Sequence, residues 1–188
     1  MSGSGLRKKI MISAMALAIL AGALLGLAVW HGVFLEVGFG EREIGPLVMA
    51  CRERLGDYKD SGRAMKVVHE GLVKDFNLNA SVGVGIYYDD PRITPKDKLR
   101  ANLCWLLEAG NQARIVEVSA RYNVLQLGRQ KYAAADFPYR TRLSIIIGVL
   151  KVYPALSRHV LKHGIRPTEI IEIYDAPAGV ITYAKRIP

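Results

Sequence analysis

The chain has 188 residues, of which 51% are hydrophobic and 23% are charged. Its 26 Lys and Arg residues outnumber its 17 Asp and Glu residues, which gives a net charge of +9 at pH 7. This apolar content excludes a disordered chain, and two cysteines are too few for a miniprotein built on disulfides. The basic residues form neither a long run nor a stripe interleaved with aromatic residues, so no nucleic-acid partner is expected.

A long apolar run lies near the N-terminus, after a basic segment over residues 1–9. Ile10–Trp30 contains 21 residues and no charge. About 20 apolar residues cross the hydrocarbon layer of a bilayer, so residues 10–31 are predicted to form a single transmembrane helix with an interfacial tryptophan at its end. A cleaved signal peptide is the alternative, because small residues occupy positions 21–23, but the apolar run continues beyond them and favours an uncleaved signal anchor.

The charges beside this helix predict its orientation in the membrane. Arg7, Lys8 and Lys9 precede the helix, whereas the segment that follows it is mainly acidic. Because basic flanks stay in the cytoplasm, the rest of the chain is expected on the non-cytoplasmic side. A glycine-rich linker over residues 32–45 is predicted to connect the helix to one globular domain over residues 46–188.

The first half of this domain, about residues 46–110, is predicted to contain one helix among short strands. Asp60 or Ser61 can begin the helix, and its apolar residues recur at spacings of three and four. These residues form a single stripe: Met65, Val68, Leu72 and Phe76. Runs of β-branched and apolar residues predict three strands, with a helical turn at Thr94-Pro95 before the third: Leu47–Leu55, Ser81–Tyr88 and Arg100–Leu107.

The second half, about residues 111–188, follows the same order. Thr141 is predicted to cap a helix, Pro154 interrupts that helix and Gly164 ends it. The large apolar residues of the helix are Leu143, Ile146, Ile147 and Leu150. The predicted strands are Tyr122–Ala134, as one strand or two, then Glu169–Asp175 and Val180–Arg186.

Both halves therefore read as β-α-β-β, which predicts an α+β fold built from two similar modules. Residues 86–91 align with residues 172–177, and both segments contain Tyr-Asp-x-Pro. Each module has one helix to cover one face of its strands. Two modules must therefore join to bury enough apolar surface, and a cleft between them is expected.

Several segments resemble the GyrI-like (gyrase-inhibitor-like) domain family and together cover nearly the whole domain. They are Val84–Pro91, Thr94–Arg100, Ile171–Tyr174 and the corner formed by Arg54, Gly56 and Tyr58. The resemblance implies a duplicated β-α-β-β fold whose cleft takes small molecules, as in the effector-binding domains of drug-responsive transcription regulators. It also implies that a minority of members hydrolyse electrophilic compounds.

Phe137-Pro138-Tyr139 and Tyr153-Pro154-Ala155-Leu156 resemble the membrane-anchored branch of this family. Its animal member is a receptor for autophagy of the endoplasmic reticulum. The long acidic C-terminal extension of that receptor has no counterpart up to Pro188. That receptor works in the cytosol, so this resemblance places the domain on the cytosolic side, in conflict with the orientation that the flanking charges predict.

Glu172 is the first candidate for the ligand site. Residues in a strand alternate between its faces, so Ile171 and Ile173 are expected to pack under the helices while Glu172 and Tyr174 face the cleft. A partly desolvated carboxylate beside aromatic rings suits a cationic, apolar ligand. The resemblance places the family's ligand-facing glutamate at this position. A glutamate paired with an arginine, or open to solvent, is the alternative.

Tyr88 and Trp105 are the other candidate ligand residues. In the repeat alignment Tyr88 matches Tyr174, so both could wall the cleft, and a purely structural role is equally open for each. Trp105 lies on a central strand, where core packing is the favoured interpretation and ligand stacking the alternative. Ile86 matches Glu172, so the cleft is expected to lack a pair of carboxylates.

No metal or cofactor is expected. His159 and His163 lie four residues apart on a helix but have no third ligand nearby in the sequence. Cys51 and Cys104 lie on different strands without a CxxC spacing. Buried thiols are the default interpretation for them, and a disulfide is the alternative if the domain is exported.

Three functions stay open. The first is a membrane-tethered module that binds a small cationic or amphipathic molecule. The second is a receptor that recruits a protein partner through its surface. The third is a hydrolase in which Glu172 activates water or attacks an electrophilic carbon and Tyr174 donates a proton, although no catalytic residue is assigned.

Overall fold

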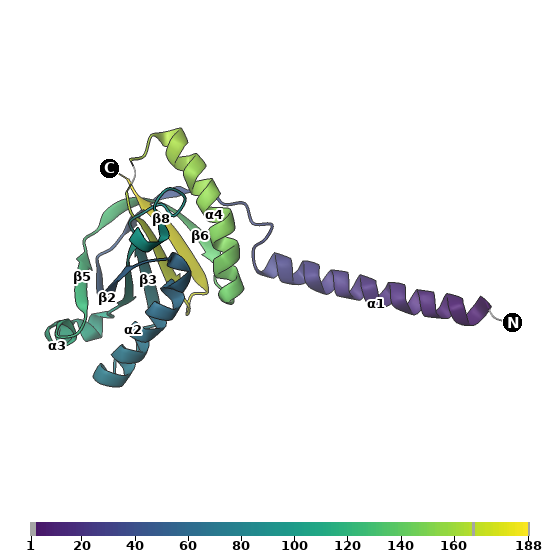
Figure 1. The fold of residues 1–188 in the computed structure, drawn as a ribbon, viewed down its shortest axis with the longest axis horizontal. Coiled ribbons are helices and arrows are strands. Elements are labelled where there is room, and N and C mark those ends of the chain that lie inside the picture. The colour runs from purple at the N-terminus through teal and green to yellow at the C-terminus, as the bar shows by residue number, and fades with distance from the viewer. Residues whose placement is uncertain (1–2, 167, 188) are drawn as a thin grey trace.

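The structure is a computed structural model that describes residues 3–166 and 168–187. The N-terminal helix α1 (Gly3–Trp30) extends away from the rest of the chain (Figure 1). Its apolar part, Arg7–Trp30, is long and apolar enough to cross a membrane, and none of its residues is buried. The helix predicted for this region is therefore present.

The rest of the chain combines a mixed set of helices with one antiparallel sheet. The strands are β1 (Gly40–Ile44), β2 (Leu47–Leu55), β3 (Val82–Tyr87), β4 (Arg100–Leu106), β5 (Asn123–Leu127), β6 (Gln130–Pro138), β7 (Ile170–Asp175) and β8 (Val180–Arg186). The helices are α2 (Ser61–Phe76), α3 (Ile115–Ser119) and α4 (Arg142–His163), and short 3-10 turns cover Tyr58–Asp60, Lys96–Lys98 and Ala109–Arg114. The order of strands in the sheet is β1-β6-β8-β7-β3-β4-β2-β5.

The sheet is curled so strongly that side chains from both of its end strands meet on the concave face, which we call the inner face. Ile44 from β1 and Leu125 from β5 come from opposite ends of the strand order, yet they pack in the same apolar cluster. Val84, Ile86 and Ile171 from the middle strands fill the centre of this inner face. Side chains of the sheet itself therefore form one half of the core.

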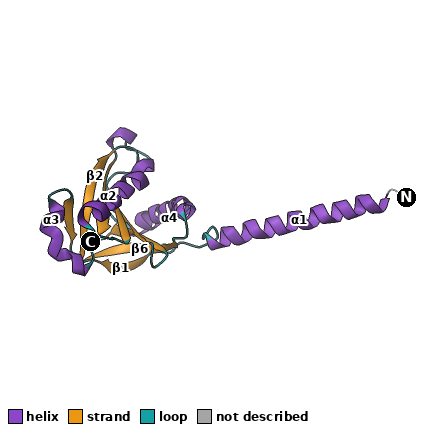
Figure 2. Cartoon of the chain, turned by 90° about the horizontal axis from the view of Figure 1, so that it is seen from below, coloured by secondary structure: helices purple, strands orange, loops and turns teal. Residues whose placement is uncertain are grey.

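Helices α2 and α4 cover the outer face of the sheet (Figures 1 and 2). The stripe predicted for α2 is confirmed, because Met65, Val68, Leu72 and Phe76 are all buried. Val152 of α4 packs with Phe137 of β6 in a second cluster. Between the two helices, β3 and β7 form the floor of what we call the central seam.

Part of the predicted linker is a strand, which corrects the sequence analysis. Residues 40–44 form β1, which pairs antiparallel with β6. Four of its five residues are exposed and only Ile44 is buried. Edge strands of this kind carry charges that discourage pairing with other chains, and Glu41-Arg42-Glu43 therefore gave no strand signal in the sequence.

The other predicted strands are confirmed, and the region predicted as one strand or two is two strands joined at Gly128-Arg129. Thr141 caps α4 through a hydrogen bond that its side chain accepts from the backbone N–H of Leu143, and Gly164 ends the helix in the left-handed conformation. Pro154 lies inside this single helix without interrupting it, contrary to expectation.

Candidate functional site

Glu172 lies on β7, near the middle of the eight-stranded sheet. Its partners across the ladder are Gly85 of β3 and Tyr183 of β8. Only 3% of its surface is exposed. The side chain enters the central seam, between the strands covered by α2 and those covered by α4.

The side chains of β7 alternate between the two faces of the sheet as predicted, but each set faces the surroundings that were predicted for the other. Ile171 packs in the inner cluster of the curled sheet and not under the helices. Glu172 and Tyr174 instead share the face that the helices cover. The reason is the curl: it lets the sheet fill its own inner face, so the helices are left to cover the polar side of this strand.

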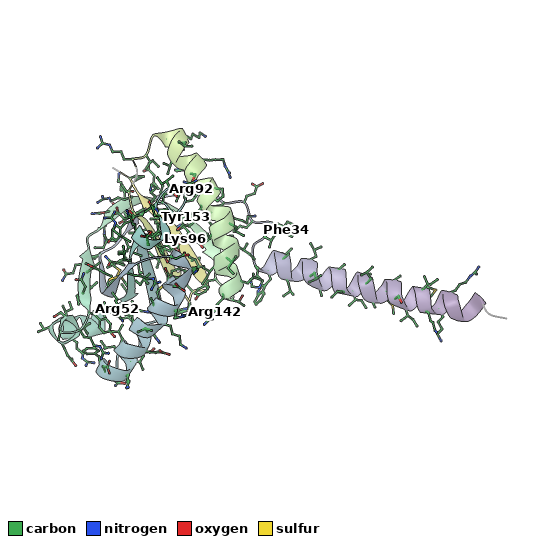
Figure 3. All side chains as sticks on the ribbon, in the orientation of Figure 1. Phe34, Arg52, Arg92, Lys96, Arg142 and Tyr153 are labelled. Atoms are coloured by element: carbon green, nitrogen blue, oxygen red, sulfur yellow. A yellow bond between two sulfur atoms is a disulfide. The ribbon has the colours of Figure 1, made fainter. Side chains whose placement is uncertain are left out.

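Two tyrosine hydroxyls hold the carboxylate. The hydroxyl of Tyr153 donates a hydrogen bond to Oε1 of Glu172 over 2.6 Å, and the hydroxyl of Tyr174 donates to Oε2. Tyr153 projects from α4 over the sheet (Figure 3). Both oxygens are therefore engaged by neutral donors from two different elements.

Further tyrosine rings surround this group. The ring of Tyr183 lies edge-on to Tyr153, with ring centroids 6.2 Å apart, and Tyr58 packs on Tyr87 at 4.9 Å. Tyr139 lies edge-on to Tyr174 at 6.1 Å. Aromatic pairs at such separations favour one another beyond the burial of their surface, so each of these three pairs helps to fix the rings near the carboxylate.

Glycines make room for these rings. Gly85 lies directly opposite Glu172, and a Cβ at this position would come within 2.7 Å of the ring of Tyr87. On α4, a Cβ at Gly148 would collide with the hydroxyl of Tyr183. The absence of a side chain at both positions lets the rings approach the backbone closely.

Burial controls the protonation of this cluster. It raises the pKa of Glu172 above its ordinary value, although the hydrogen bonds from Tyr153 and Tyr174 partly oppose the shift. Burial and the charge of Glu172 also raise the pKa values of Tyr153 and Tyr174 well above the ordinary range, so both remain proton donors. None of the ion pairs in the described part of the chain includes Glu172, so the carboxylate is buried with neutral partners.

Tyr183 contributes an unused polar atom to the cluster. Its side chain is fully buried, and within residues 3–166 and 168–187 its hydroxyl has no hydrogen-bond partner. A buried hydroxyl without a partner is costly and uncommon. It is therefore available to a bound molecule.

The structure brings two of the four predicted ligand residues together, Glu172 and Tyr174. Tyr88 lies on the other side of the sheet, where its hydroxyl accepts a hydrogen bond from the side-chain amide of Asn102. Trp105 shares the outer face with the seam but packs under α2, and its indole N–H donates to the backbone carbonyl of Met65. Trp105 therefore has the surroundings expected of a residue that packs in the core.

Tyr87, Tyr153 and Tyr183 were not predicted from the sequence as site residues. A signal for Tyr87 was present, since Gly83, Gly85 and Tyr87 alternate on one face of β3. Tyr153 and Tyr183 gave no such signal, because their place in the cluster depends on how α4 and β8 meet across the sheet.

Two hollows open elsewhere on the surface, with volumes of about 440 and 430 Å³. The first lies between β2 and α2, around Arg54 and Arg63. The second is lined by basic residues that include Lys131 and Arg186. Glu172 lines neither of them and is only 3% exposed, so its side chain is closed off from solvent in this structure.

The cysteines correct another expectation. Cys51 and Cys104 face each other across β2 and β4 and are joined by a disulfide. The default interpretation of two buried thiols was therefore wrong. The pairing register, which the sequence alone did not show, places the two side chains opposite each other.

No family model matches the chain. Over 178 residues it is 25% identical to human testis-expressed protein 264, an alignment that covers 91% of this chain and 52% of the relative. It is also 25% identical over 145 residues to the mouse homolog, with 73% and 45% covered. The chain thus spans about half the length of the curated relatives it matches.

Solved structures with a similar fold include the EcmrR C-terminal domain, with a TM-score of 0.55, 9% identity, and 81% of this chain and 98% of that chain covered. SAV2435 bound to tetraphenylphosphonium aligns with a TM-score of 0.52 at 11% identity, covering 80% and 94%. An integron cassette protein from Vibrio cholerae aligns with a TM-score of 0.52 at 12% identity, covering 81% and 98%. These similarities support the expected α+β fold, which the chain shares with these domains.

A longer EcmrR chain, in a complex with DNA, also aligns, with a TM-score of 0.56 at 11% identity and with 97% of this chain and 68% of that chain covered. The expectation that the chain has no nucleic-acid partner therefore gains no support from these similarities.

Proposed function

We propose that the chain is a membrane-anchored domain that binds a small, cationic and largely apolar molecule at Glu172. One observation carries this proposal: the carboxylate is buried among tyrosine rings, and its hydrogen-bond partners within the described residues are hydroxyl groups. A buried carboxylate without a cation is costly. A cationic ligand would supply the missing charge, and the surrounding rings would attract it through their faces.

Binding requires the seam to open. A ligand that reaches Glu172 must displace the hydroxyl of Tyr153 or that of Tyr174, and Tyr183 then offers its free hydroxyl. Tyr153 stands on α4, so a rotation of its side chain or a small shift of the helix uncovers the carboxylate. SAV2435, which has a similar fold, is bound to tetraphenylphosphonium, and this lipophilic cation is therefore a suitable probe.

The test is the melting temperature of the full chain in lipid nanodiscs with and without tetraphenylphosphonium. A ligand that binds only the folded state stabilises it by about 2.7 kcal/mol when present at a hundred times its Kd. We expect stabilisation of the wild type and its loss in Glu172→Gln. Triphenylphosphine oxide, which has similar rings but no charge, is expected to stabilise neither protein.

Glu53→Gln is the matched control, because it makes the same chemical change at an exposed position of β2. It is expected to keep the full stabilisation. Tyr153→Phe removes a hydroxyl that competes for the carboxylate and is expected to bind the cation at least as tightly. Equal stabilisation of the wild type and Glu172→Gln, or none in the wild type, would refute the proposed site.

The proposal also includes the anchor and its orientation. Helix α1 spans the membrane, and the domain lies on the non-cytoplasmic side. The basic residues before α1 support this orientation, and so does the Cys51–Cys104 disulfide, since disulfides persist in oxidising compartments. A reporter enzyme that works only outside the cytoplasm should be active when it is fused to the C-terminus. Activity of a reporter that works only in the cytoplasm, fused at the same position, would contradict the orientation.

A further inference from the structure

Helix α4 exposes a stripe of large apolar side chains. It turns small residues, including Ser144 and Gly148, toward the sheet, while Leu150 is 70% exposed and Leu161 is 82% exposed. The stripe consists of Leu143, Ile146, Leu150 and Leu161, with the exposed Pro154 between them. These positions recur at the spacing of one helix face. The stripe therefore runs along the helix, with the polar Ser157 between Pro154 and Leu161 on the same face.

The charges of α4 all have the same sign. Its sequence contains four basic residues other than histidine and no acidic residue. Arg142 lies on one flank of the apolar stripe, and Lys151, Arg158 and Lys162 lie on the other. An apolar stripe flanked by basic residues is typical of helices that lie in the interface of an anionic membrane.

Contacts with the segment that follows α1 hold α4 close to the anchor. Nδ1 of His31, the residue directly after α1, lies 2.9 Å from the hydroxyl of Ser144 in the first turn of α4. The ammonium group of Lys151 donates to the backbone carbonyl of Val33. The ring of Phe39 packs on His159 in a later turn, with centroids 5.3 Å apart. The linker is therefore bound to α4 at several levels along the helix.

The arrangement of the two helices points the stripe toward the anchor side. Of the helices in the domain, α4 lies nearest to α1 in both ribbon views (Figures 1 and 2). Figure 1 also shows α4 running across the direction of α1. If α1 is perpendicular to a bilayer, α4 is close to parallel with its surface.

We propose that α4 is an interfacial helix whose apolar stripe rests on the lipid bilayer that α1 crosses. The inference rests on the membrane anchor but not on ligand binding at Glu172. Helix α4, like α1, is long and apolar enough to cross a membrane. Because its other face is buried against the sheet, it lies on the membrane and does not cross it. Basic side chains beside the stripe meet the lipid head groups.

The test measures where nitroxide labels lie when the full chain is reconstituted in vesicles of phosphatidylcholine and phosphatidylglycerol. Leu150→Cys and Leu161→Cys place one label each on the stripe, while the native cysteines are buried and joined in a disulfide. We expect both labels to collide far more often with oxygen, which dissolves in lipid, than with a water-soluble nickel chelate.

Val116→Cys is the matched control, because Val116 is an apolar residue of α3 that is 84% exposed. Its label is expected to prefer the nickel chelate by several-fold. Ala18→Cys, in the middle of α1, reports on the anchor itself and is expected to prefer oxygen.

Each other outcome overturns the inference. Labels at positions 150 and 161 that prefer nickel as strongly as the one at 116 would place α4 in water. Low access to both reagents would indicate a protein contact, either with a second copy or with another partner. A label at position 18 that prefers nickel would remove the anchor on which α4 depends, while leaving ligand binding at Glu172 to its own test.

Discussion

Glu172 is the residue at which burial and chemistry are most closely coupled. Its pKa in the folded chain is raised above the ordinary 4.5 by burial. The folded state therefore binds a proton more tightly than the unfolded state. Protonation of Glu172 therefore stabilises the folded state fully below the ordinary pKa, and this stabilisation is lost as the pH rises through the raised pKa.

Glu172→Gln is expected to remove this pH dependence. The wild type should lose stability as the pH increases above 4.5, by about 1.4 kcal/mol for each unit of pKa shift. The variant has no proton to lose and should show a flatter profile. Urea unfolding of the full chain in micelles, repeated across this pH range, measures the difference, and parallel profiles for the two proteins would contradict it.

A shift of one residue explains why the sequence misplaced Tyr88. The repeat alignment matched residue 86 with Glu172 and Tyr88 with Tyr174. In the β3–β7 ladder, however, Gly85 pairs with Glu172 and Gly83 with Tyr174. Paired residues lie on the same face of the sheet, so the odd-numbered residues of β3, including Tyr87, share the face of Glu172. In a strand, an offset of one residue exchanges the two faces. The Tyr-Asp-x-Pro match was real as a sequence pattern, but the register of a ladder depends on the partner strand.

At the scale of elements, α2 follows the simplest rule. Its stripe at spacings of three and four residues is buried as predicted. Leu72→Ala is expected to cost about 2–5 kcal/mol, because it deletes buried methyl groups and leaves a cavity. Val73→Ala, one residue further along the same helix, should change stability by no more than about 0.5 kcal/mol since the side chain is exposed.

Urea midpoints of both variants check this contrast. Similar losses for the two would show that α2 does not pack on the sheet by the stripe that its sequence indicates.

Helix α4 shows where such a rule fails. Leu143, Ile146 and Leu150 are exposed, although they are among the large apolar residues of the helix. In this first half of α4, Ser144 and Gly148 face the sheet, because the rings of Tyr183 and Phe137 occupy the space beneath Gly148. Helix periodicity identifies which residues share a face but not what that face meets. The caps at Thr141 and Gly164, which depend on local backbone chemistry alone, were predicted correctly.

At the scale of the whole molecule, the disulfide joins β2 to β4 within the inner cluster. It closes a loop between residues separated by 53 positions. Reduction is expected to lower the free energy of unfolding by about 2–4 kcal/mol, mainly because the unfolded chain gains freedom. Urea unfolding with and without reductant measures the loss.

A variant with alanine at both Cys51 and Cys104 is the control and should be indifferent to the reductant. An unchanged midpoint in the wild type, once alkylation has shown both thiols to be free, would contradict the predicted stabilisation.

The overall class could be read from the sequence, and the closure of the sheet could not. Alternating and β-branched runs identified the strands, and the repeated order of elements indicated two modules. The curl brings Ile44 and Leu125, which are distant in the sequence, into the same apolar cluster. No local pattern encodes such a pairing, so the inner face and the seam opposite it emerged only in three dimensions.

Strand β1 has a practical consequence for anyone who wishes to prepare the domain without its anchor. A fragment that begins at residue 46 would lack β1, so residues 130–134 of β6 would have no strand to pair with on that side. It would also lack Ile44, which is part of the inner cluster. A bare strand margin is adhesive toward other copies. A fragment that begins near residue 32 retains the complete β1–β6 ladder, so we expect it to aggregate less than one that begins at residue 46.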